Sequence, residues 1–421
     1  MARPTIGIWL IGVKGGVAAT TLVGLCALKR GAIGDAGLVS QLPQFAKLDL
    51  AGWDSFVAGG HEIRDVRLID EAMRLVTESR AIERRLIEDC AAELDAIDRR
   101  TRLGTLQNVG PTISQFAAPG VPQDESPRQV IARLQHDLRE FQQSNGLEHV
   151  VVVNVASTEP PIDVGRFAPR WEGFQDHLDG PEGRKLPASA LYAIAALDLG
   201  FSYINFTPSL GSAPSAISEL ARIRATRHMG CDGKTGETLL KSVLAPMFRS
   251  RNLQVLSWVG HNIFGNMDGK VLNDPVNKQA KIASKDHLLR QILGYRPQTL
   301  VSIEYIESLG DWKTAWDHVH FMGFLGTPMT LQFIWQGCDS LLAAPLVLDL
   351  IRFTELAWRR GQVGTLTFLA SFFKSPYDVQ EQSFLDQFRM LEAWAELQEH
   401  GSPQRPDRES NFDMREDRRQ Q

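Results

Sequence analysis

Charged and amide side chains concentrate in residues 229–285, in a pattern that suits a phosphorylated sugar. One run begins at Cys231 and reads CDGKTGET; the other begins at His261, reads HNIFGNMDG and continues to the two lysines of KIASK. Ammonium groups bind phosphate and carboxylates bind hydroxyl groups, so this mixture with glycine and asparagine predicts a site for a phosphorylated, polyhydroxylated ligand. The alternative is two polar surface loops, because the same residue types are common in turns.

The composition is that of a globular protein. The chain has 421 residues, a formal net charge of −5, 43% hydrophobic residues and 23% charged residues, which predicts two or three domains with a large core. Since there is no basic excess, nucleic acid is not an expected partner. No apolar run approaches about 18 residues, and the N-terminus does not resemble a signal peptide, so neither a membrane segment nor a secretion signal is expected.

Cysteine usage predicts a reducing compartment. Cys26, Cys90, Cys231 and Cys338 are far apart and form no CxxC pair. A zinc site or a disulfide framework is therefore not expected, and we predict a cytoplasmic protein. We assign no metal ligands, although aspartates of the two polar runs could hold a cation near a phosphate.

A glycine turn follows the first strand-like run. Residues 5–13 are apolar and β-rich, and KGGVAATT then leads into a helical pattern that stops at Gly31. Strand, glycine turn and helix together present free backbone N–H groups to a pyrophosphate, so the turn predicts a dinucleotide site. Its spacing, G-x-x-G-G-x-x-A from Gly12 to Ala19, is one residue longer than the common fingerprint, which weakens the motif taken alone.

A carboxylate beyond the second strand is the candidate for a ribose hydroxyl. Glu62 comes after the strand-like run at residues 55–60 and close to a helix start, whereas Asp35 lies in a turn. Dinucleotide folds use a carboxylate near this place to bind the ribose. The alternative for Glu62 is a carboxylate that stabilises a helix start through the macrodipole.

The order of elements predicts two domains. Strand and helix patterns alternate through the first half, and the strand at residues 149–155 ends in small and hydroxyl residues, as ligand-binding strands of open α/β sheets do. From Leu239 the pattern alternates as in antiparallel strands. We therefore expect an α/β fold: a Rossmann-like, doubly wound parallel sheet from residues 1–238 and 339–399, and an inserted α+β domain with an antiparallel sheet, for catalysis and oligomerisation, from residues 239–338.

The last part of the chain has two further signals. GCDS at residues 337–340 opens the apolar helix LLAAPLVLDLIRFTELAWRRG. Asp339 or Ser340 would cap that helix, because short polar side chains accept from the free N–H groups of a helix start. Residues 400–421 are charged and low in apolar residues, so a disordered tail is expected.

These runs together resemble the myo-inositol-phosphate synthase family, also called inositol-3-phosphate synthase, as a divergent member of bacterial type. The resemblance extends from about residue 6 to residue 376. Its most specific runs are DGKTGET, GNMDG, KIASK and CDSLLAAPLVLDL. The runs GGVAATTLVG, FVAGGHEIRD and ASTEPP match as well.

The resemblance implies an NAD-dependent isomerase that converts glucose 6-phosphate to 1D-myo-inositol 3-phosphate. Hydride would leave C5 of the open-chain sugar for NAD, and the new ketone would make the C6 proton acidic. The resulting enolate would attack the C1 aldehyde and close the ring, after which NADH would reduce the C5 ketone. Oxyanions develop at C5 and C1, and lysines can stabilise them without a metal.

By position, Lys281, Lys285 and Lys374 match the active-site lysines of that family, and Asp232 and Glu304 complete the catalytic set that we predict. Lys281 is assigned to the oxyanion and to proton transfer, and the other two lysines to sugar oxygens or phosphate. Clustering favours the neutral form of one amine, which can then act as a base. The positions that match the family's cofactor lining are Gly15, Gly16, Val17, Ala18, Glu62, Ala156, Ser157, Asp232, Thr235, Asn266, Asp268, Asp339 and Ser340.

Among the positions that depart from the family pattern, two introduce a carboxylate. Glu304 stands where the family has a lysine in an I-K-Y run, and Glu237 stands where it has a glutamine. A carboxylate at position 304 could act as a base or pair with Lys281, and it would repel a nearby phosphate. If Glu304 diverts the enzyme, Glu304→Lys should raise activity on glucose 6-phosphate. The alternative is that Glu304 is an ordinary strand residue and that Lys313 or Arg296 supplies the positive charge.

Three functions therefore stay open from the sequence. The first is the synthase reaction on glucose 6-phosphate, and the second is related chemistry on a different phosphosugar. The third is a sensor or scaffold that binds NAD without turnover. The resemblance also implies a homotetramer assembled through the inserted domain.

Overall fold

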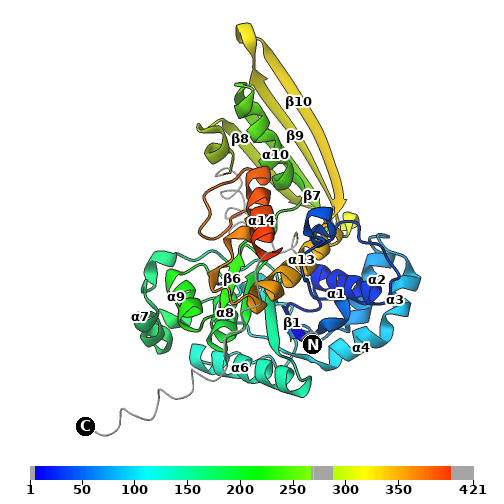
Figure 1. Ribbon diagram of the computed structural model, residues 1–421, viewed down its shortest axis with the longest axis vertical. Coiled ribbons are helices and arrows are strands. Elements are labelled where there is room, and N and C mark those ends of the chain that lie inside the picture. The colour runs from blue at the N-terminus through cyan, green and yellow to red at the C-terminus, as the bar shows by residue number, and fades with distance from the viewer. Residues whose placement is uncertain (1–4, 267–268, 270–287, 400–421) are drawn as a thin grey trace.

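Two β-sheets organise the molecule, a broad one at its base and a narrow one that rises from it (Figure 1). The computed structural model describes residues 5–266, 269 and 288–399. After the second sheet, the chain returns to the base through the long helix α13 (Asp339–Arg359). The second sheet is therefore an insertion into the α/β fold.

The base sheet confirms the expected Rossmann-like architecture. Its order is β11-β6-β5-β4-β1-β2-β3, and its strand pairs are parallel. Chain order reverses between β1 and β4, so the loops after these two strands diverge and leave a crevice. The strands are β1 (Ile6–Ile11), β2 (Phe56–Glu62), β3 (Thr101–Leu103), β4 (His149–Asn154), β5 (Ser202–Asn205), β6 (Arg227–Gly230) and β11 (Gly364–Thr365).

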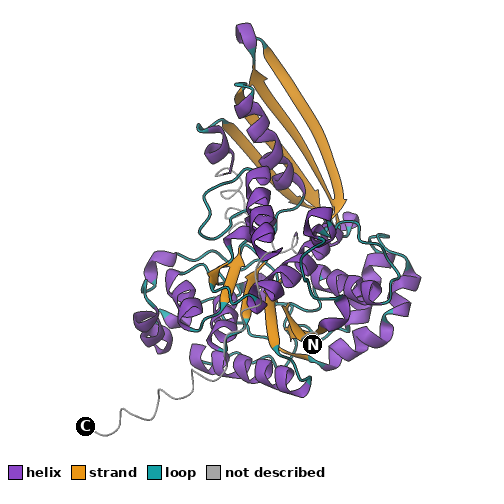
Figure 2. Ribbon diagram, viewed as in Figure 1, coloured by secondary structure: helices purple, strands orange, loops and turns teal. Residues whose placement is uncertain are grey.

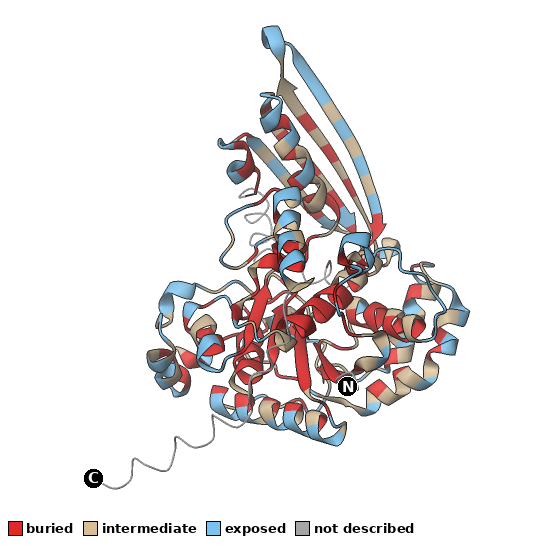
Figure 3. Ribbon diagram, viewed as in Figure 1, coloured by how far each residue is buried: buried red, intermediate tan, exposed pale blue. Residues whose placement is uncertain are grey.

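Helices cover both faces of the base sheet, which explains why β1 is apolar along its whole length and β4 is apolar between its two ends. Every residue of β1 and β4 is buried, as the red strands of Figure 3 show. Ile8 and Leu10 join one core, whereas Trp9 and Ile11 join the core on the other face. The first core holds α1 (Gly16–Lys29), α2 (Leu68–Thr77), α3 (Arg84–Asp89), α4 (Ala91–Arg99), α13 and α14 (Phe384–Glu399); the second holds α5 (Pro111–Ser114), α6 (Pro127–Ser144), α7 (Trp171–Asp176), α8 (Ala188–Asp198) and α9 (Ser215–Ile223).

The second sheet has the order β10-β9-β7-β8, and a helix covers one of its faces (Figure 2). Helix α10 (Gly236–Ser250) packs there through Phe248, against Trp258 and Val319. On the opposite face Leu300 and Ile334 are 54% and 71% exposed. The strands are β7 (Gln254–Phe264), β8 (Gln298–Tyr305), β9 (Trp312–Met322) and β10 (Pro328–Cys338).

The second sheet is mixed, whereas the sequence predicted an antiparallel one. β7 pairs antiparallel with β9 but parallel with β8. A parallel pair requires a long crossover, and the connection at residues 265–297 is long enough to supply it. Alternating side chains do not distinguish the two directions, which is why the sequence pattern missed the parallel pair.

The start of α13 corrects a second expectation. Neither Asp339 nor Ser340 caps the helix: Cys338 is the N-cap residue, and its side chain makes no capping bond. The carboxylate of Asp311 acts instead, with Oδ2 accepting from the backbone N–H of Ser340 at 2.8 Å. The capping preference applied to the sequence considers only residues at the helix start, so it could not predict an acceptor from the connection between β8 and β9.

Short elements interrupt the long connections. Residues 100–128 and 162–186 contain β3, α5, α7 and several 3₁₀ turns. Within the described residues no helix is long and apolar enough to cross a membrane. The 3₁₀ helices are η1 (Val39–Gln41), η2 (Pro43–Phe45), η3 (Trp53–Ser55), η4 (Val164–Arg166), η5 (His177–Asp179), η6 (Gly183–Lys185), η7 (Glu307–Leu309), η8 (Phe324–Gly326) and η9 (Thr367–Phe372).

Candidate functional site

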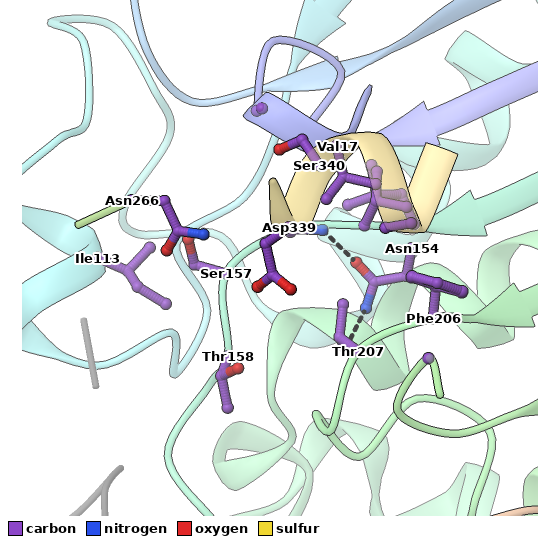
Figure 4. A pocket seen from close by; sticks show the side chains of 18 of the residues that line it. Val17, Ile113, Asn154, Ser157, Thr158, Phe206, Thr207, Asn266, Asp339 and Ser340 are labelled. Carbon is purple, nitrogen blue, oxygen red and sulfur yellow. Dashed lines mark hydrogen bonds between the residues drawn. The ribbon is translucent and has the colours of Figure 1, made fainter. Parts of the chain in front are cut away.

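A cavity of about 290 Å³ lies at the carboxyl ends of β1, β2 and β4, where the base sheet meets the second sheet. Its walls are the glycine turn, the loop after β4, the start of α13 and the connection between β8 and β9. Figure 4 shows Ser157, Asn266, Asp339 and Ser340 around this cavity. The crevice that the strand order predicts is therefore open to a ligand.

The glycine turn forms one wall of the cavity. Gly12 has a φ of +77°, and Gly15 is the N-cap residue of α1, which no side chain caps. A Cβ on Gly16 would lie 2.8 Å from Ser340 Oγ, so glycine is what allows α1 and α13 to begin side by side. Gly15, Gly16 and Val17 line the cavity. An uncapped helix start at a cavity wall suits an anionic pyrophosphate.

Asp311 connects the second sheet to the start of α13. Its Oδ1 accepts from Ser340 Oγ at 2.9 Å, and its backbone N–H donates to Ser79 Oγ at 3.0 Å. Burial raises the pKa of this carboxyl. Gly310 and Asp311 both line the cavity, but sequence reasoning did not select them. The available signal was a Gly-Asp pair in the turn between two strand patterns.

Glu62 lies at the end of β2 and lines the cavity, with its carboxylate already engaged. Oε2 accepts from the backbone N–H of Lys14 at 3.0 Å, and Oε1 accepts from that of Ile63 at 2.9 Å. The guanidinium of Arg64 donates to Oε2 at 3.2 Å. Glu62 therefore fixes the glycine turn to β2, and a ribose hydroxyl would share an oxygen with these donors.

The end of β4 supplies the opposite wall. Asn154 Oδ1 accepts from the backbone N–H of Ala156 at 3.2 Å, and Asn154 Nδ2 donates to Thr207 Oγ1 at 3.3 Å (Figure 4). These bonds join the loop after β4 to the loop after β5. Ala156 and Ser157 line the cavity as a result.

Lys374 and Asp232 form an ion pair in the cavity. Lys374 Nζ lies 2.7 Å from Asp232 Oδ1, and the two side chains are 16% and 9% exposed. The backbone holds the pair in register, because Lys374 N donates to Asp232 O at 2.7 Å and Gly233 forms a bridge with Phe373. Two residues that are far apart in the sequence thus come together at the ligand cavity.

Lys234 belongs to the same polar run but lies behind the cavity wall. Its Nζ donates to the Gln387 side chain of α14, and the residue is 2% exposed. Burial, and to a smaller degree the charge of Lys374, lowers the pKa of Lys234 to about 7. It is not among the described residues that line the cavity.

Lys313 lines the cavity, and Glu304 is not among its described lining residues. Lys313 Nζ lies 3.8 Å from Asp339 Oδ2 and 5.1 Å from the centre of the Phe264 ring. Glu304 is exposed and pairs across the sheet with Ile263, on the face that α10 does not cover. The structure therefore favours Lys313, one of the two alternatives raised from the sequence, as the cation at this end of the cavity.

A small hollow adjoins the cavity at the start of α10. Thr235, Lys313 and Lys374 line both spaces, and Glu237 lines the hollow. Glu237 Oε1 lies 2.5 Å from Lys241 Nζ, in an ion pair that is 2% exposed. The departure at position 237 therefore places a carboxylate, with its own counter-charge, beside the site.

The cavity gathers most of the predicted residues that the structure describes. Ala18 is buried in α1 and is not among the described lining residues. Asp268, Lys281 and Lys285 lie outside the described residues. No group of three or more metal-binding side chains occurs in the described part of the chain. The predicted residues that line the cavity are Gly15, Gly16, Val17, Glu62, Ala156, Ser157, Asp232, Thr235, Asn266, Asp339, Ser340 and Lys374.

Residues 6–396 match the family model described as myo-inositol-1-phosphate synthase. The chain belongs to the myo-inositol-1-phosphate synthase family. It is 30% identical over 412 residues to inositol-3-phosphate synthase 1 of Bacteroides thetaiotaomicron, an alignment that covers 92% of this chain and 93% of that relative. The human inositol-3-phosphate synthase 1 is 29% identical, over 76% of this chain but only 57% of its own length.

Two solved structures show that the fold is the family's. Inositol-3-phosphate synthase from Caenorhabditis elegans gives a TM-score of 0.84 at 23% identity, covering 96% of this chain and 87% of that one. A myo-inositol-1-phosphate synthase-related protein from Thermotoga maritima gives 0.75 at 22% identity, covering 95% of this chain and 100% of that one. In both cases the likeness concerns architecture, and the roles of single residues in this family member rest on its own geometry.

Proposed function

We propose that this protein is an NAD-dependent synthase that converts glucose 6-phosphate to 1D-myo-inositol 3-phosphate. The observation that supports this most strongly is the meeting of a glycine turn, the Lys374–Asp232 pair and Lys313 in one cavity. A wall that suits a dinucleotide and walls that carry cations face the same space, as oxidation and ring closure of a sugar phosphate require. Family membership selects the reaction among those that such a cavity could support.

The residues present fit NAD. Gly15 and Gly16 leave the start of α1 without side chains, and a Cβ at Gly16 would take up space beside Ser340 Oγ. The open N–H groups would hold the pyrophosphate. Glu62 would share its carboxylate with a ribose hydroxyl, and Ser157 with Asp339 would line the path toward the second sheet.

When bound, NAD would supply the acceptor and the donor of hydride. Lys374 and Lys313 would place positive charge beside sugar oxygens on which negative charge develops. Asp232 would hold the Lys374 ammonium in the cavity through their 2.7 Å contact. The roles proposed for Lys281 and Lys285, proton transfer and phosphate binding, rest on the family resemblance alone.

Incubation of the protein with NAD and glucose 6-phosphate tests this proposal. We expect an inositol phosphate signal in the phosphorus NMR spectrum, with no net consumption of NAD because the hydride is returned. Turnover of another sugar phosphate alone would replace the proposal with the second candidate. Retention of NAD with no turnover of any sugar phosphate would replace it with a sensor or scaffold.

The second candidate, a synthase for a different phosphosugar, is favoured by Glu237. Its carboxylate lies at the start of α10, next to Thr235 and the two cavity lysines, where the family pattern has an uncharged glutamine. A carboxylate there favours hydroxyl donors over phosphate oxygens. A panel of aldose and ketose phosphates, assayed with wild type and Glu237→Gln, would identify the substrate.

We further propose that the protein is cytoplasmic and forms a homotetramer through the second sheet. The uncovered face of that sheet exposes Leu300 and Ile334, and such a face is commonly covered by another subunit. Light scattering behind size exclusion measures the mass. A monomer at micromolar concentration would contradict the assembly and leave the catalytic proposal intact.

A further inference from the structure

Five charged side chains of alternating sign line the cavity from the end of β2 to the end of α2. Neighbouring members are in contact, at distances between 2.9 and 3.5 Å. Glu62 alone among them has a role in the proposed function, so the charges of the other four need an explanation. In chain order the five are Glu62, Arg64, Glu71, Arg74 and Glu78, and together they are called the charge row.

The carboxylate of Glu62, at the start of the charge row, accepts from five donors. Three are the backbone N–H groups of Lys14, Ile63 and Arg64, at 3.0, 2.9 and 3.2 Å. The other two are Nε and Nη2 of the Arg64 guanidinium, at 3.3 and 3.2 Å. A carboxylate offers about four lone-pair directions. A ribose hydroxyl that approaches Glu62 therefore competes with a donor, and the Arg64 side chain is the donor that can move, because the other three belong to the backbone.

Glu62 also indicates where the 2′-oxygen of the ribose would lie. The bond from Lys14 N ties its carboxylate to the glycine turn, which would hold the pyrophosphate. In dinucleotide folds a carboxylate beyond the second strand binds the ribose 2′-hydroxyl, and a nearby arginine accommodates a 2′-phosphate. Arg64 bonds directly to Glu62 in this chain. A phosphate on the 2′-oxygen would therefore need the guanidinium of Arg64.

Glu71 holds that guanidinium from its other side. Arg64 Nη1 donates to Glu71 Oε2 at 3.3 Å, and the two side chains are 17% and 12% exposed. The same oxygen accepts from Arg74 Nη1 at 3.5 Å. Glu71 lies in the first turn of α2, where the helix fixes its backbone. Arg64 is thus held between two carboxylates that already balance its charge.

We propose that Glu71 is a specificity-determining residue, which makes the cavity select NAD against NADP, the dinucleotide with a phosphate on the ribose 2′-oxygen. This inference rests on the proposed binding of NAD. When a ribose hydroxyl takes the place of Arg64 on Glu62, the guanidinium stays bound to Glu71. A 2′-phosphate would have to draw Arg64 away from Glu71 and would lie beside two carboxylates, which repel it. NAD therefore leaves the contact between Arg64 and Glu71 in place, and NADP breaks it.

The test compares dissociation constants for NAD and NADP, measured by calorimetric titration of the full chain, in wild type and Glu71→Gln. We expect wild type to bind NADP at least roughly tenfold more weakly than NAD, because like charges would face each other. Glutamine keeps an acceptor in the first turn of α2 but carries no charge, so it releases Arg64. We expect Glu71→Gln to bind NADP roughly tenfold more tightly than wild type, the size of one hydrogen bond to a charged group, and NAD within about threefold of wild type.

Glu78→Gln is the matched control. It removes the same charge from the same row, but Glu78 bonds to Arg74 at 2.9 Å and is not among the described partners of Arg64. We expect it to leave the ratio of the two dissociation constants unchanged. Arg64→Met in the Glu71→Gln chain should remove the gain in NADP affinity. In that double variant Glu62 keeps its three backbone donors, so the end of β2 stays fixed to the glycine turn.

Different outcomes overturn different claims. An unchanged ratio in Glu71→Gln, an equal gain in Glu78→Gln, or a gain that survives Arg64→Met would overturn the role of Glu71 and leave the proposed function standing. Wild type that binds NADP as tightly as NAD would do the same. Absence of NAD binding by wild type would overturn the proposed function, and this inference with it.

A second variant covers the case in which Glu71→Gln does not fold. Glu71→Asp keeps the negative charge in the first turn of α2, and its shorter side chain withdraws from Arg64. We expect it to give part of the gain in NADP affinity. A ratio equal to that of wild type in Glu71→Asp would then overturn the inference.

Discussion

The two sheets meet at one cavity but are stabilised in different ways. The central strands β1 and β4 of the base sheet are mostly apolar and buried on both faces, so the loops after them start from fixed points. In the described structure only one face of the second sheet is covered by a helix, and near the cavity that face contains buried ion pairs. Lys241 pairs there with Glu237 at 2.5 Å and lies 3.7 Å from Asp317 Oδ1, in a group that is at most 2% exposed.

The difference separates two tasks. The base sheet contributes backbone groups and small side chains, such as Gly15, Gly16 and Ser157, which hold a ligand by shape and by N–H donors, and its last loops add the Lys374–Asp232 pair. The second sheet and the segments next to it contribute charge, through Asp311 and Lys313. A cofactor that stays bound needs the first kind of wall, and a sugar whose charge changes during reaction needs the second.

Two ion pairs, Lys241–Glu237 and Lys374–Asp232, can be compared by substitution, and loss of the first should have the largest effect on stability. Lys241→Met would leave the Glu237 and Asp317 carboxylates buried without their cation, and we expect a loss of about 3–5 kcal/mol in the free energy of unfolding. Urea denaturation measures it. Glu237→Gln in the same chain should restore part of the loss, and an unchanged midpoint in Lys241→Met would show that this pair does not stabilise the second sheet.

Removal of the cavity pair should affect turnover instead of stability. We expect Lys374→Met to lower turnover by about 10²- to 10³-fold, the usual size for loss of one preorganised donor, because Lys374 faces the ligand. NAD affinity should stay near that of wild type. Lys185, an exposed lysine paired with Glu182, provides the control variant Lys185→Met. Comparable losses in both variants would argue against a site at Lys374.

The base-sheet wall is tested by a smaller change. Gly16→Ala places a methyl group 2.8 Å from Ser340 Oγ, so α1 and α13 must move apart. We expect NAD to bind roughly ten- to thirtyfold more weakly, about 1.4–2 kcal/mol. Ser340→Ala in the same chain removes the clashing atom and should recover part of the affinity. Calorimetric titration of the single and double variants gives the coupling directly.

The smallest effect is expected on the uncovered face of the second sheet. Glu304 lies there, so Glu304→Lys should change turnover of glucose 6-phosphate by less than about twofold, as for other surface substitutions. Lys313→Met, on the cavity side, should lower it at least tenfold. A large gain from Glu304→Lys would support the family pattern over the placement in the structure.

The elements of the base sheet were readable from the sequence because their signals are local. Apolar runs gave β1 and β4, and the glycine turn gave the start of α1. The parallel pairing of β7 with β8 was not predicted, because apolar and polar side chains alternate in the same way in parallel and antiparallel strands. The acceptor that caps α13 was also missed, because Asp311 reaches it from another segment.

The residues of the site also divide into those that local sequence signals predicted and those that depend on distant segments. The glycine turn and the polar run selected Gly15, Gly16 and Asp232, the family resemblance selected Lys374, and the structure places all four at one cavity. The sequence could raise Lys313 only as an alternative to Glu304, because a β-strand shows which side chains share a face but not which face meets the ligand. That choice depends on how the second sheet packs against α10 and the base sheet.

By itself, the sequence determined the family, the base-sheet fold and most residue types at the cavity, since these follow from local patterns and motif spacing. Only the tertiary structure decided which charges meet: Lys374 with Asp232, and Lys241 with Glu237. The physical reason is that charge interactions depend on distance and burial, and segments far apart in the chain set both.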